Sequence, residues 1–150
     1  MKQIFSICIL LCTFSFQSIA QEQDSVMGFW LTDDESLIIE ITECEAGSPN
    51  VCGFIRDFYK QSAEYQILLQ NADILCGIPL ISNLSRNEEK SRWDDGQIFD
   101  LETETMYGAI LKITDGNLIV RAYDKYEFMG LNYTWKRTSP TDESCVQSNE

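Results

Sequence analysis

The sequence predicts an all-β fold: a single antiparallel up-and-down β-barrel of about eight strands with at most one short helix. Residues 131–137 alternate with a period of two, which is typical of a half-buried strand and not of a helix. Asp115-Gly116 separates two strand-like runs and is a strong hairpin signal. A chain of such hairpins closes most economically into a barrel, because closure leaves no strand edge unpaired. A two-sheet sandwich is the alternative.

The first 20 residues have the pattern of a signal peptide. Lys2 is followed by an apolar run that is too short to span a membrane, and small residues at Ser18 and Ala20 predict cleavage after Ala20. Cys8 and Cys12 are lost with this segment. No later apolar run has the length of a membrane span. We therefore expect an exported protein, periplasmic or extracellular.

The remaining chain is long enough for one packed domain, predicted over residues 21–138, followed by a polar tail over 139–150. The formal net charge of −13 becomes −14 when Lys2 is removed, so nucleic acid and anionic membrane surfaces are poor partners. The chain contains no histidine, which excludes Ser-His-Asp, Cys-His and histidine-ligated zinc chemistry.

The first half of the predicted domain contains three strands. They cover residues 27–31, 36–44 and 52–59, and in the second of them Leu37, Ile39 and Ile41 alternate with the side chains between them. Residues 60–75 break this alternation. Leu68, Ala72 and Leu75 are spaced along one helix face, so a short helix or an ordered loop is expected before Pro79 ends it.

The second half begins with a short strand over 79–84 and a polar link over 85–92. Residues 93–137 then form four consecutive strands joined by tight turns. In the strand before the last, Leu118, Val120 and Ala122 share one face, which is the expected interior of the barrel.

Four cysteines remain after cleavage, and an even number in an exported chain predicts two disulfides with three pairings open. Cys44 and Cys52 flank a turn-forming stretch between two strands, so they are the first choice of pair. That choice leaves Cys76 and Cys145 to hold the tail. A reduced, buried Cys76 is an alternative.

Residues on the first and last strands resemble the closure signature of lipocalin-type (calycin) barrels. Gly28 and Trp30 form a G-x-W on the first strand, and Arg137 ends the last strand two residues after Trp135. In that group the tryptophan closes one end of the barrel and an arginine of the last strand lies over it. The resemblance implies that these four residues have this structural role here.

A second resemblance covers nearly all of the predicted domain. The chain is similar to the exported bacterial family called domain of unknown function 2147, and departs from it where Glu104-Thr105 replaces a Gly-Lys turn and where Ala122 replaces a glycine. The family has no established reaction, so the resemblance implies a fold and an export route, and ligand binding only by analogy between folds. The matching residues are Gly28, Phe29, Trp30, 52–55, 75–80, 93–100, Tyr107, 118–123, Gly130 and 134–137.

Candidate ligand-binding residues are arginines and aromatics on the strands. Arg121 lies in an otherwise apolar strand, where it would either clamp a ligand carboxylate inside the barrel or point outward to an acidic neighbour. Arg56 has the same two interpretations. Tyr107, Tyr123 and Tyr133, with Trp30 and Trp135, would line a pocket or simply fill the core.

The richest run of oxygen ligands is better explained by turn chemistry than by calcium, because its spacing does not match an EF-hand loop. No metal, cofactor or catalytic residue is assigned, since nothing in the sequence brings two acids into one cleft. The run consists of Asp94, Asp95, Gly96, Asp100, Glu102 and Glu104.

These observations favour an exported protein that binds a small, mostly apolar ligand inside a β-barrel, with Arg121 available for a ligand carboxylate. One alternative is a cell-envelope interaction module with a filled core and an exposed apolar patch. A histidine-free carboxylate hydrolase is the third, and it requires two converging acids, one of them with a raised pKa. Whether the protein is a monomer or a homodimer is left open.

Overall fold

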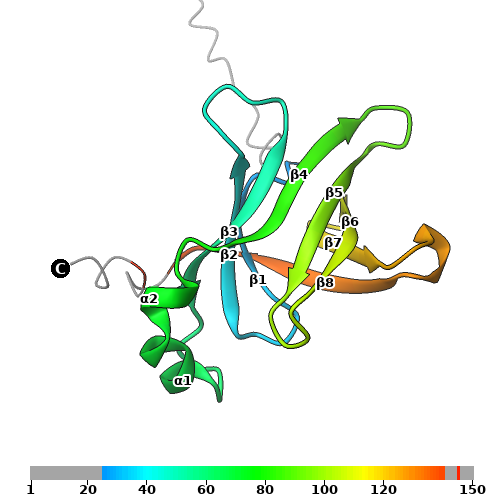
Figure 1. Ribbon diagram of the computed structural model, residues 1–150. Helices are drawn as coiled ribbons and strands as arrows, with labels where there is room; N and C mark the ends of the chain where they lie inside the picture. Colours follow the sequence, from blue (N-terminus) through cyan, green and yellow to red (C-terminus); the bar gives the residue numbers. More distant parts are fainter. Residues whose placement is uncertain (1–24, 141–144, 146–150) are drawn as a thin grey trace, which may run out of the picture.

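The computed structural model of the protein describes residues 25–140 and Cys145 (Figure 1). Eight antiparallel strands follow one another around a closed barrel, and β1 pairs with β8 to complete the ring, which confirms the predicted fold class. The predicted signal peptide over 1–20 lies outside the described residues. The strands are β1 (Gly28–Leu31), β2 (Leu37–Glu43), β3 (Val51–Phe58), β4 (Pro79–Asn87), β5 (Arg92–Asp100), β6 (Thr105–Thr114), β7 (Asn117–Tyr123) and β8 (Leu131–Thr138).

The hairpin between β6 and β7 shows how local sequence sets the register. Asp115 and Gly116 have φ values of 52° and 76°, the left-handed pair that a tight two-residue hairpin requires. Thr114 consequently pairs with Asn117, and the ladder continues to Gly108 opposite Tyr123. The Asp-Gly hairpin prediction is confirmed.

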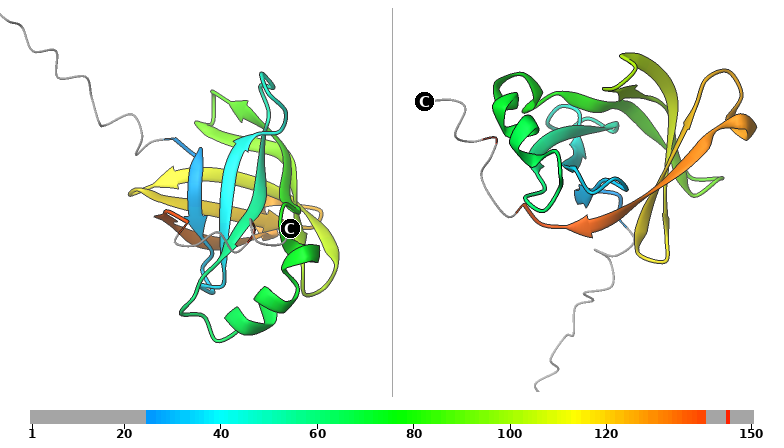
Figure 2. Two further views of the ribbon diagram at one scale, coloured as in Figure 1. Left: turned by 90° about the vertical axis from the view of Figure 1, so that its left-hand side faces the viewer. Right: turned by 90° about the horizontal axis from the view of Figure 1, so that it is seen from below.

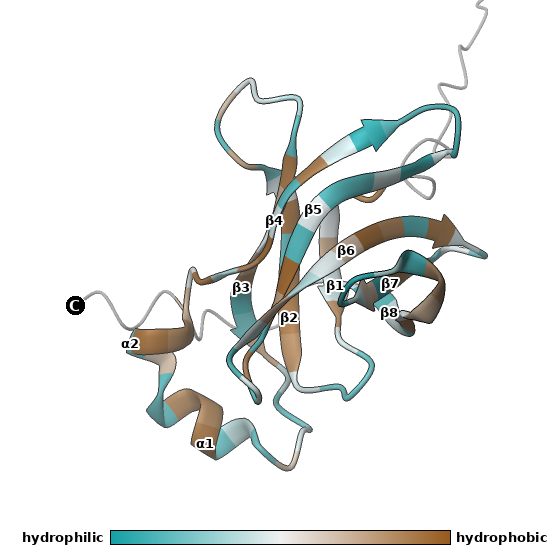
Figure 3. Cartoon of the chain, turned by 45° about the vertical axis from the view of Figure 1, so that its right-hand side comes forward, coloured by the Kyte–Doolittle hydropathy of each residue, from teal (hydrophilic) through white to brown (hydrophobic). Residues whose placement is uncertain are grey.

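Alternate residues of each strand point into the barrel and form its core. In β7 the inward residues include Leu118 and Val120, both fully buried, and Leu118 faces the buried Trp135 of β8 as the alternation predicted. Figure 2 shows the strands curving around this interior, and Figure 3 shows the apolar residues along β2. The largest fully buried side chains are Trp30, Phe58, Ile38, Ile39, Ile41, Ile55, Ile81, Leu84, Leu111, Leu118, Val51 and Val120.

The segment between β3 and β4 forms two short helices, where at most one was predicted. They are α1 (Tyr65–Gln70) and α2 (Ala72–Leu75), separated where the backbone of Asn71 leaves the helical region at φ −106° and ψ 14°. Both lie outside the strand ring (Figure 2), and α2 buries Ala72 against the core. A single-turn 3-10 helix, η2 (Glu127–Met129), connects β7 to β8.

None of the helices within residues 25–140 is long and apolar enough to cross a lipid bilayer.

Half of the predicted polar link over 85–92 is strand. β4 continues to Asn87 and β5 begins at Arg92, so only residues 88–91 form the turn. Ser85 pairs with Asp94 and Arg86 with Trp93 in the ladder. Polar residues are accommodated here because several of them, including Arg86, point to solvent from a projecting hairpin.

Both disulfides have the predicted pairing. Cys44 bonds to Cys52 across the β2–β3 hairpin, and Cys76 bonds to Cys145, which attaches the C-terminal tail to the turn after α2. The alternative of a reduced Cys76 is therefore wrong. Two structural disulfides fit an oxidising compartment outside the cytoplasm.

Candidate functional site

One end of the barrel is closed by Trp30 and Arg137. The indole of Trp30 is fully buried and its Nε1 donates a hydrogen bond to the carbonyl oxygen of Val26 at 2.8 Å. The guanidinium of Arg137 lies over the indole, with Cζ 4.2 Å from the ring centroid. Its Nη1 and Nη2 donate to the carbonyl oxygens of Met27 and Ser25 at 3.1 and 2.6 Å. Arg137 thus fastens the chain before β1 across the barrel end.

Gly28 is required at this closure for two reasons. Its φ is 116°, a region that side-chain-bearing residues rarely adopt. A Cβ atom there would also lie 3.0 Å from Nη1 of Arg137. The arrangement expected from the G-x-W with a terminal arginine is therefore present for Gly28, Trp30 and Arg137, whereas Trp135, expected in the same role, is buried in β8 and contributes to the pocket at the other end.

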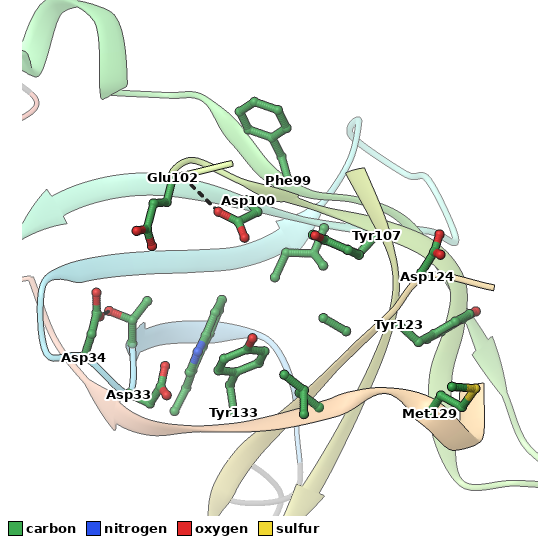
Figure 4. A pocket seen from close by; sticks show the side chains of 15 residues that line it. Asp33, Asp34, Phe99, Asp100, Glu102, Tyr107, Tyr123, Asp124, Met129 and Tyr133 are labelled. Atoms are coloured by element: carbon green, nitrogen blue, oxygen red, sulfur yellow. Dashed lines mark hydrogen bonds between the residues drawn. The ribbon is translucent and has the colours of Figure 1, made fainter. Parts of the chain in front are cut away.

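The other end of the barrel contains a pocket of about 640 Å³ (Figure 4). Its wall comes from β5 to β8, and its rim from the β1–β2 turn, the β5–β6 turn and the β7–β8 connection. The interior narrows below it, where the fully buried core residues fill the barrel. The lining residues are Thr32, Asp33, Asp34, Ile98, Phe99, Asp100, Glu102, Tyr107, Ala122, Tyr123, Asp124, Met129, Leu131, Tyr133 and Trp135.

Three of the predicted aromatic residues form the pocket wall. Tyr107 and Tyr133 extend toward the cavity from different strands, each with its hydroxyl in the opening (Figure 4), and Trp135 also belongs to the lining. Tyr123 reaches only the rim and points away from the cavity. Its ring lies over Gly108, where an added Cβ would come within 2.4 Å of it. Trp30 does not line the pocket.

The structure places both candidate arginines away from the pocket. Arg121 points outward from β7, where Nε donates to the carbonyl oxygen of Glu127 at 2.8 Å and Nη1 to Oδ1 of Asn132 at 2.7 Å. Arg56 pairs with Glu40 at 2.7 Å, and 42 % of its side chain is exposed. Alternation along the strand is the physical reason in each case, because both arginines flank inward-facing positions.

The acid-rich run on β5 has structural uses that differ in part from the predicted turn chemistry. Asp94 is buried inside the strand and accepts hydrogen bonds from Arg92 and Asn87, at 2.8 and 3.0 Å. Asp95 has a φ of 62° in a β-bulge that shifts the register between Trp93 and Gly96. Only the end of the run, at 100–104, forms a turn. Among the residues that the structure describes, no cluster of three potential metal ligands is found.

Asp100 is fixed by that turn. Its Oδ1 accepts hydrogen bonds from the backbone N–H groups of Thr103 and Glu102 at 3.1 and 2.8 Å. These bonds lower the pKa of the Asp100 carboxyl below its ordinary value, with Thr103 the larger cause. The group stays ionised near neutral pH, which is the opposite of what a general acid requires.

Most residues of the pocket rim were not predicted from the sequence. Asp33 and Asp34 lie in the β1–β2 turn, while Asp124 and Met129 lie in the connection before β8. Residues 32–35 separate two of the predicted strands, but no local pattern shows which turns meet at one end of a barrel. The up-and-down topology decides that: the connections that follow β1, β3, β5 and β7 share one end.

Comparison with known proteins agrees with the barrel fold. Among solved structures, the chain is similar to HP1028 from Helicobacter pylori, a protein reported as a member of the lipocalin family. The two are 17% identical, with a TM-score of 0.57 over 85% of this chain and 99% of HP1028. At this identity the likeness shows a shared lipocalin-like fold. No curated protein matches the chain.

A model of a bacterial protein family also matches the chain. It is described as "Uncharacterized protein conserved in bacteria (DUF2147)" and covers residues 28–137, from the start of β1 nearly to the end of β8. The match therefore includes all eight strands apart from Thr138, together with the residues that line the pocket. The protein belongs to the DUF2147 family.

Proposed function

We propose that the protein is an exported binding protein that holds a small, mostly apolar ligand in the open end of its barrel. The pocket of about 640 Å³ carries the proposal, since ligand sites usually span roughly 300–1,000 Å³. An eight-stranded barrel is just wide enough to hold one small ligand. Aromatic and aliphatic side chains, including Tyr107, Leu131 and Tyr133, offer flat apolar contacts to such a molecule.

The same pocket weighs against the other two hypotheses. An interaction module with a filled core would leave no cavity of this size. A carboxylate hydrolase would need an acid with a raised pKa, whereas the pKa of Asp100 at the rim is lowered. Arg121 and Arg56 point away from the pocket, so neither supports a ligand held by its carboxylate.

Export is proposed from the leader-like first 20 residues together with the two disulfides. In an oxidising compartment both cross-links persist. A binding protein there would meet small molecules that enter from outside or are released from the cell envelope.

The test uses N-phenyl-1-naphthylamine, a neutral apolar dye whose fluorescence rises in an apolar site. We expect saturable binding to the wild-type protein and loss of binding in Ala122→Trp, which fills the pocket from β7. Thr134→Trp is the matched control, because Thr134 is exposed on the outer face of β8. Near-ultraviolet circular dichroism verifies that both variants fold. No binding to the wild type, or binding unaffected by Ala122→Trp, would refute the proposal.

A further inference from the structure

We infer that the ligand of this pocket is an amphipathic organic cation rather than a fatty acid or a neutral lipid. The inference rests on the proposed function and specifies its ligand class. It is carried by the distribution of charge around the cavity. Among the 15 lining residues five are acidic and none is a lysine or an arginine.

Four of the acids face one another across the opening. Figure 4 shows Asp33 and Asp34, from the β1–β2 turn, on one side, and Asp100 and Glu102, from the β5–β6 turn, on the other. The fifth, Asp124, lies beyond Tyr107 at the far side of the pocket. A cation that enters between the two turns is therefore attracted from both sides.

Two of these carboxylates are held in place by their own turns. Asp34 accepts hydrogen bonds from the hydroxyl groups of Thr32 and Ser36, and Asp100 from two backbone N–H groups. Within the described chain, the side chains of Asp33 and Glu102 form no ion pair or hydrogen bond. The turns thus hold the carboxylates of Asp34 and Asp100. Asp33 and Glu102 have no partner among the described residues and leave negative charge at the mouth of the pocket.

Nearby lysines do not neutralise this charge from inside the pocket. Lys136 points outward from β8 and pairs with Glu35 at 2.8 Å, and that pair raises the pKa of its ammonium group. Lys125 follows Asp124 but does not line the cavity. The acids are not a metal site either, because the described residues contain no group of three potential ligands close enough to hold an ion. The five carboxylates are instead distributed around the mouth of a pocket large enough for a small organic molecule.

The aromatic wall fits the same ligand class. Tyr107, Tyr133 and Trp135 present ring surfaces below the acidic rim, and aromatic faces attract organic cations through their quadrupoles. The apolar part of the ligand would lie against Met129, on the side away from the β1–β2 turn (Figure 4), and against Leu131, which also lines the pocket. Leu131 and Met129 are largely exposed, at 66% and 71%, and a bound apolar chain would cover them. An ammonium head with an aliphatic or aromatic tail satisfies both halves of the pocket.

The experiment compares three ligands of equal chain length as competitors of the neutral dye: octyltrimethylammonium, octanol and octanoate. We expect the cation to displace the dye at about tenfold lower concentration than the alcohol, since several partly screened carboxylates and the aromatic faces add to the shared apolar term. Octanoate should be the weakest of the three. Added salt should reduce the advantage of the cation and leave octanol unchanged.

The variant pair Asp33→Asn with Glu102→Gln locates the effect, because within the described chain neither wild-type side chain forms a hydrogen bond that the substitution would remove. We expect it to reduce the advantage of the cation to about threefold or less, in line with the loss of two rim charges. Glu45→Gln with Glu89→Gln is the matched control: it changes the net charge equally at exposed positions in the β2–β3 and β4–β5 turns. It should leave the advantage intact.

The outcomes separate this inference from the proposed function. If octanol or octanoate displaces a bound dye as well as the cation does, the cation preference is refuted while the binding function stands. A preference that persists in the rim variant, or that falls equally in the control, refutes its assignment to the rim acids. If the wild type binds neither dye nor cation, the proposed function itself is refuted.

Discussion

Replacing Arg137 by leucine should destabilise the barrel without changing the residues that line the pocket. Leucine cannot reproduce the guanidinium stacked 4.2 Å from the Trp30 ring centroid, nor the hydrogen bonds to the carbonyl oxygens of Met27 and Ser25. Hydrogen bonds from a charged donor contribute about 1.5 kcal/mol each at the low end, and a cation–π contact about 1 kcal/mol. Because such terms do not add fully and leucine keeps some contact with the indole, we expect a loss of about 2–4 kcal/mol.

Urea denaturation followed by tryptophan fluorescence measures this loss. Arg56→Leu is a matched control, since Arg56 also stacks on an aromatic ring, 5.2 Å from the Phe54 ring centroid, and forms an ion pair with Glu40 at 2.7 Å, but on the exposed surface. We expect the control to lose about 0.5 kcal/mol. Equal losses for the two arginines, or a loss below about 1 kcal/mol for Arg137→Leu, would show that Arg137 does not close the barrel.

Three further predictions concern other parts of the chain. Removing the Cys76–Cys145 disulfide, with a sequence separation of 69, should cost about 4 kcal/mol of unfolding free energy against about 2.5 for Cys44–Cys52, with a separation of 8; denaturation of the two double-serine variants in the reverse order would contradict the loop-entropy argument. Arg92 lowers the pKa of Glu127 from 4.5, so the pair stabilises the fold above that pH and the contribution is lost as pH falls through the lowered pKa. Glu127→Gln should therefore flatten the acid side of the stability profile by about 0.5 kcal/mol, and an unchanged profile would argue against the pair. Arg121→Leu should change the dye affinity less than about twofold, because the side chain binds η2 and Asn132 on the outer face; a large loss would return Arg121 to the ligand site.

Local patterns were sufficient for the fold. The alternation in β7 and β8 identified their inward faces, and Asp115-Gly116 set a hairpin whose geometry depends on two adjacent residues. The closed end was also predictable, because a glycine at φ 116° beside a stacked tryptophan and arginine leaves a sequence signature. The strand alternation and the hairpin depend on residues that are neighbours in the sequence. The closed end depends on a tryptophan–arginine pairing that recurs in lipocalin-type barrels.

The open end was harder to predict because it depends on three-dimensional closure. Asp33 and Glu102 are 69 positions apart and appear in the sequence only as turn residues. They line one rim because the connections that follow β1 and β5 lie at the same end of the barrel. For Arg121, in contrast, the sequence suggested a role in ligand binding that the structure does not support. A charge in an apolar strand suggested a ligand clamp as one of two interpretations, but alternation along β7 places the guanidinium on the outer face, where it donates to Asn132.

The most direct test of the account is a ¹⁵N-resolved NMR titration of the protein with N-phenyl-1-naphthylamine. Binding in the open end predicts that amide shifts concentrate at Ile98, Tyr107, Ala122 and Tyr133 and leave α1 and the closed end at Gly28 unaffected. Amide shifts confined to the helical segment around Ile67 and Ile74, whose apolar side chains are exposed, would contradict a ligand site inside the barrel. The absence of amide shifts up to saturating dye would contradict it as well.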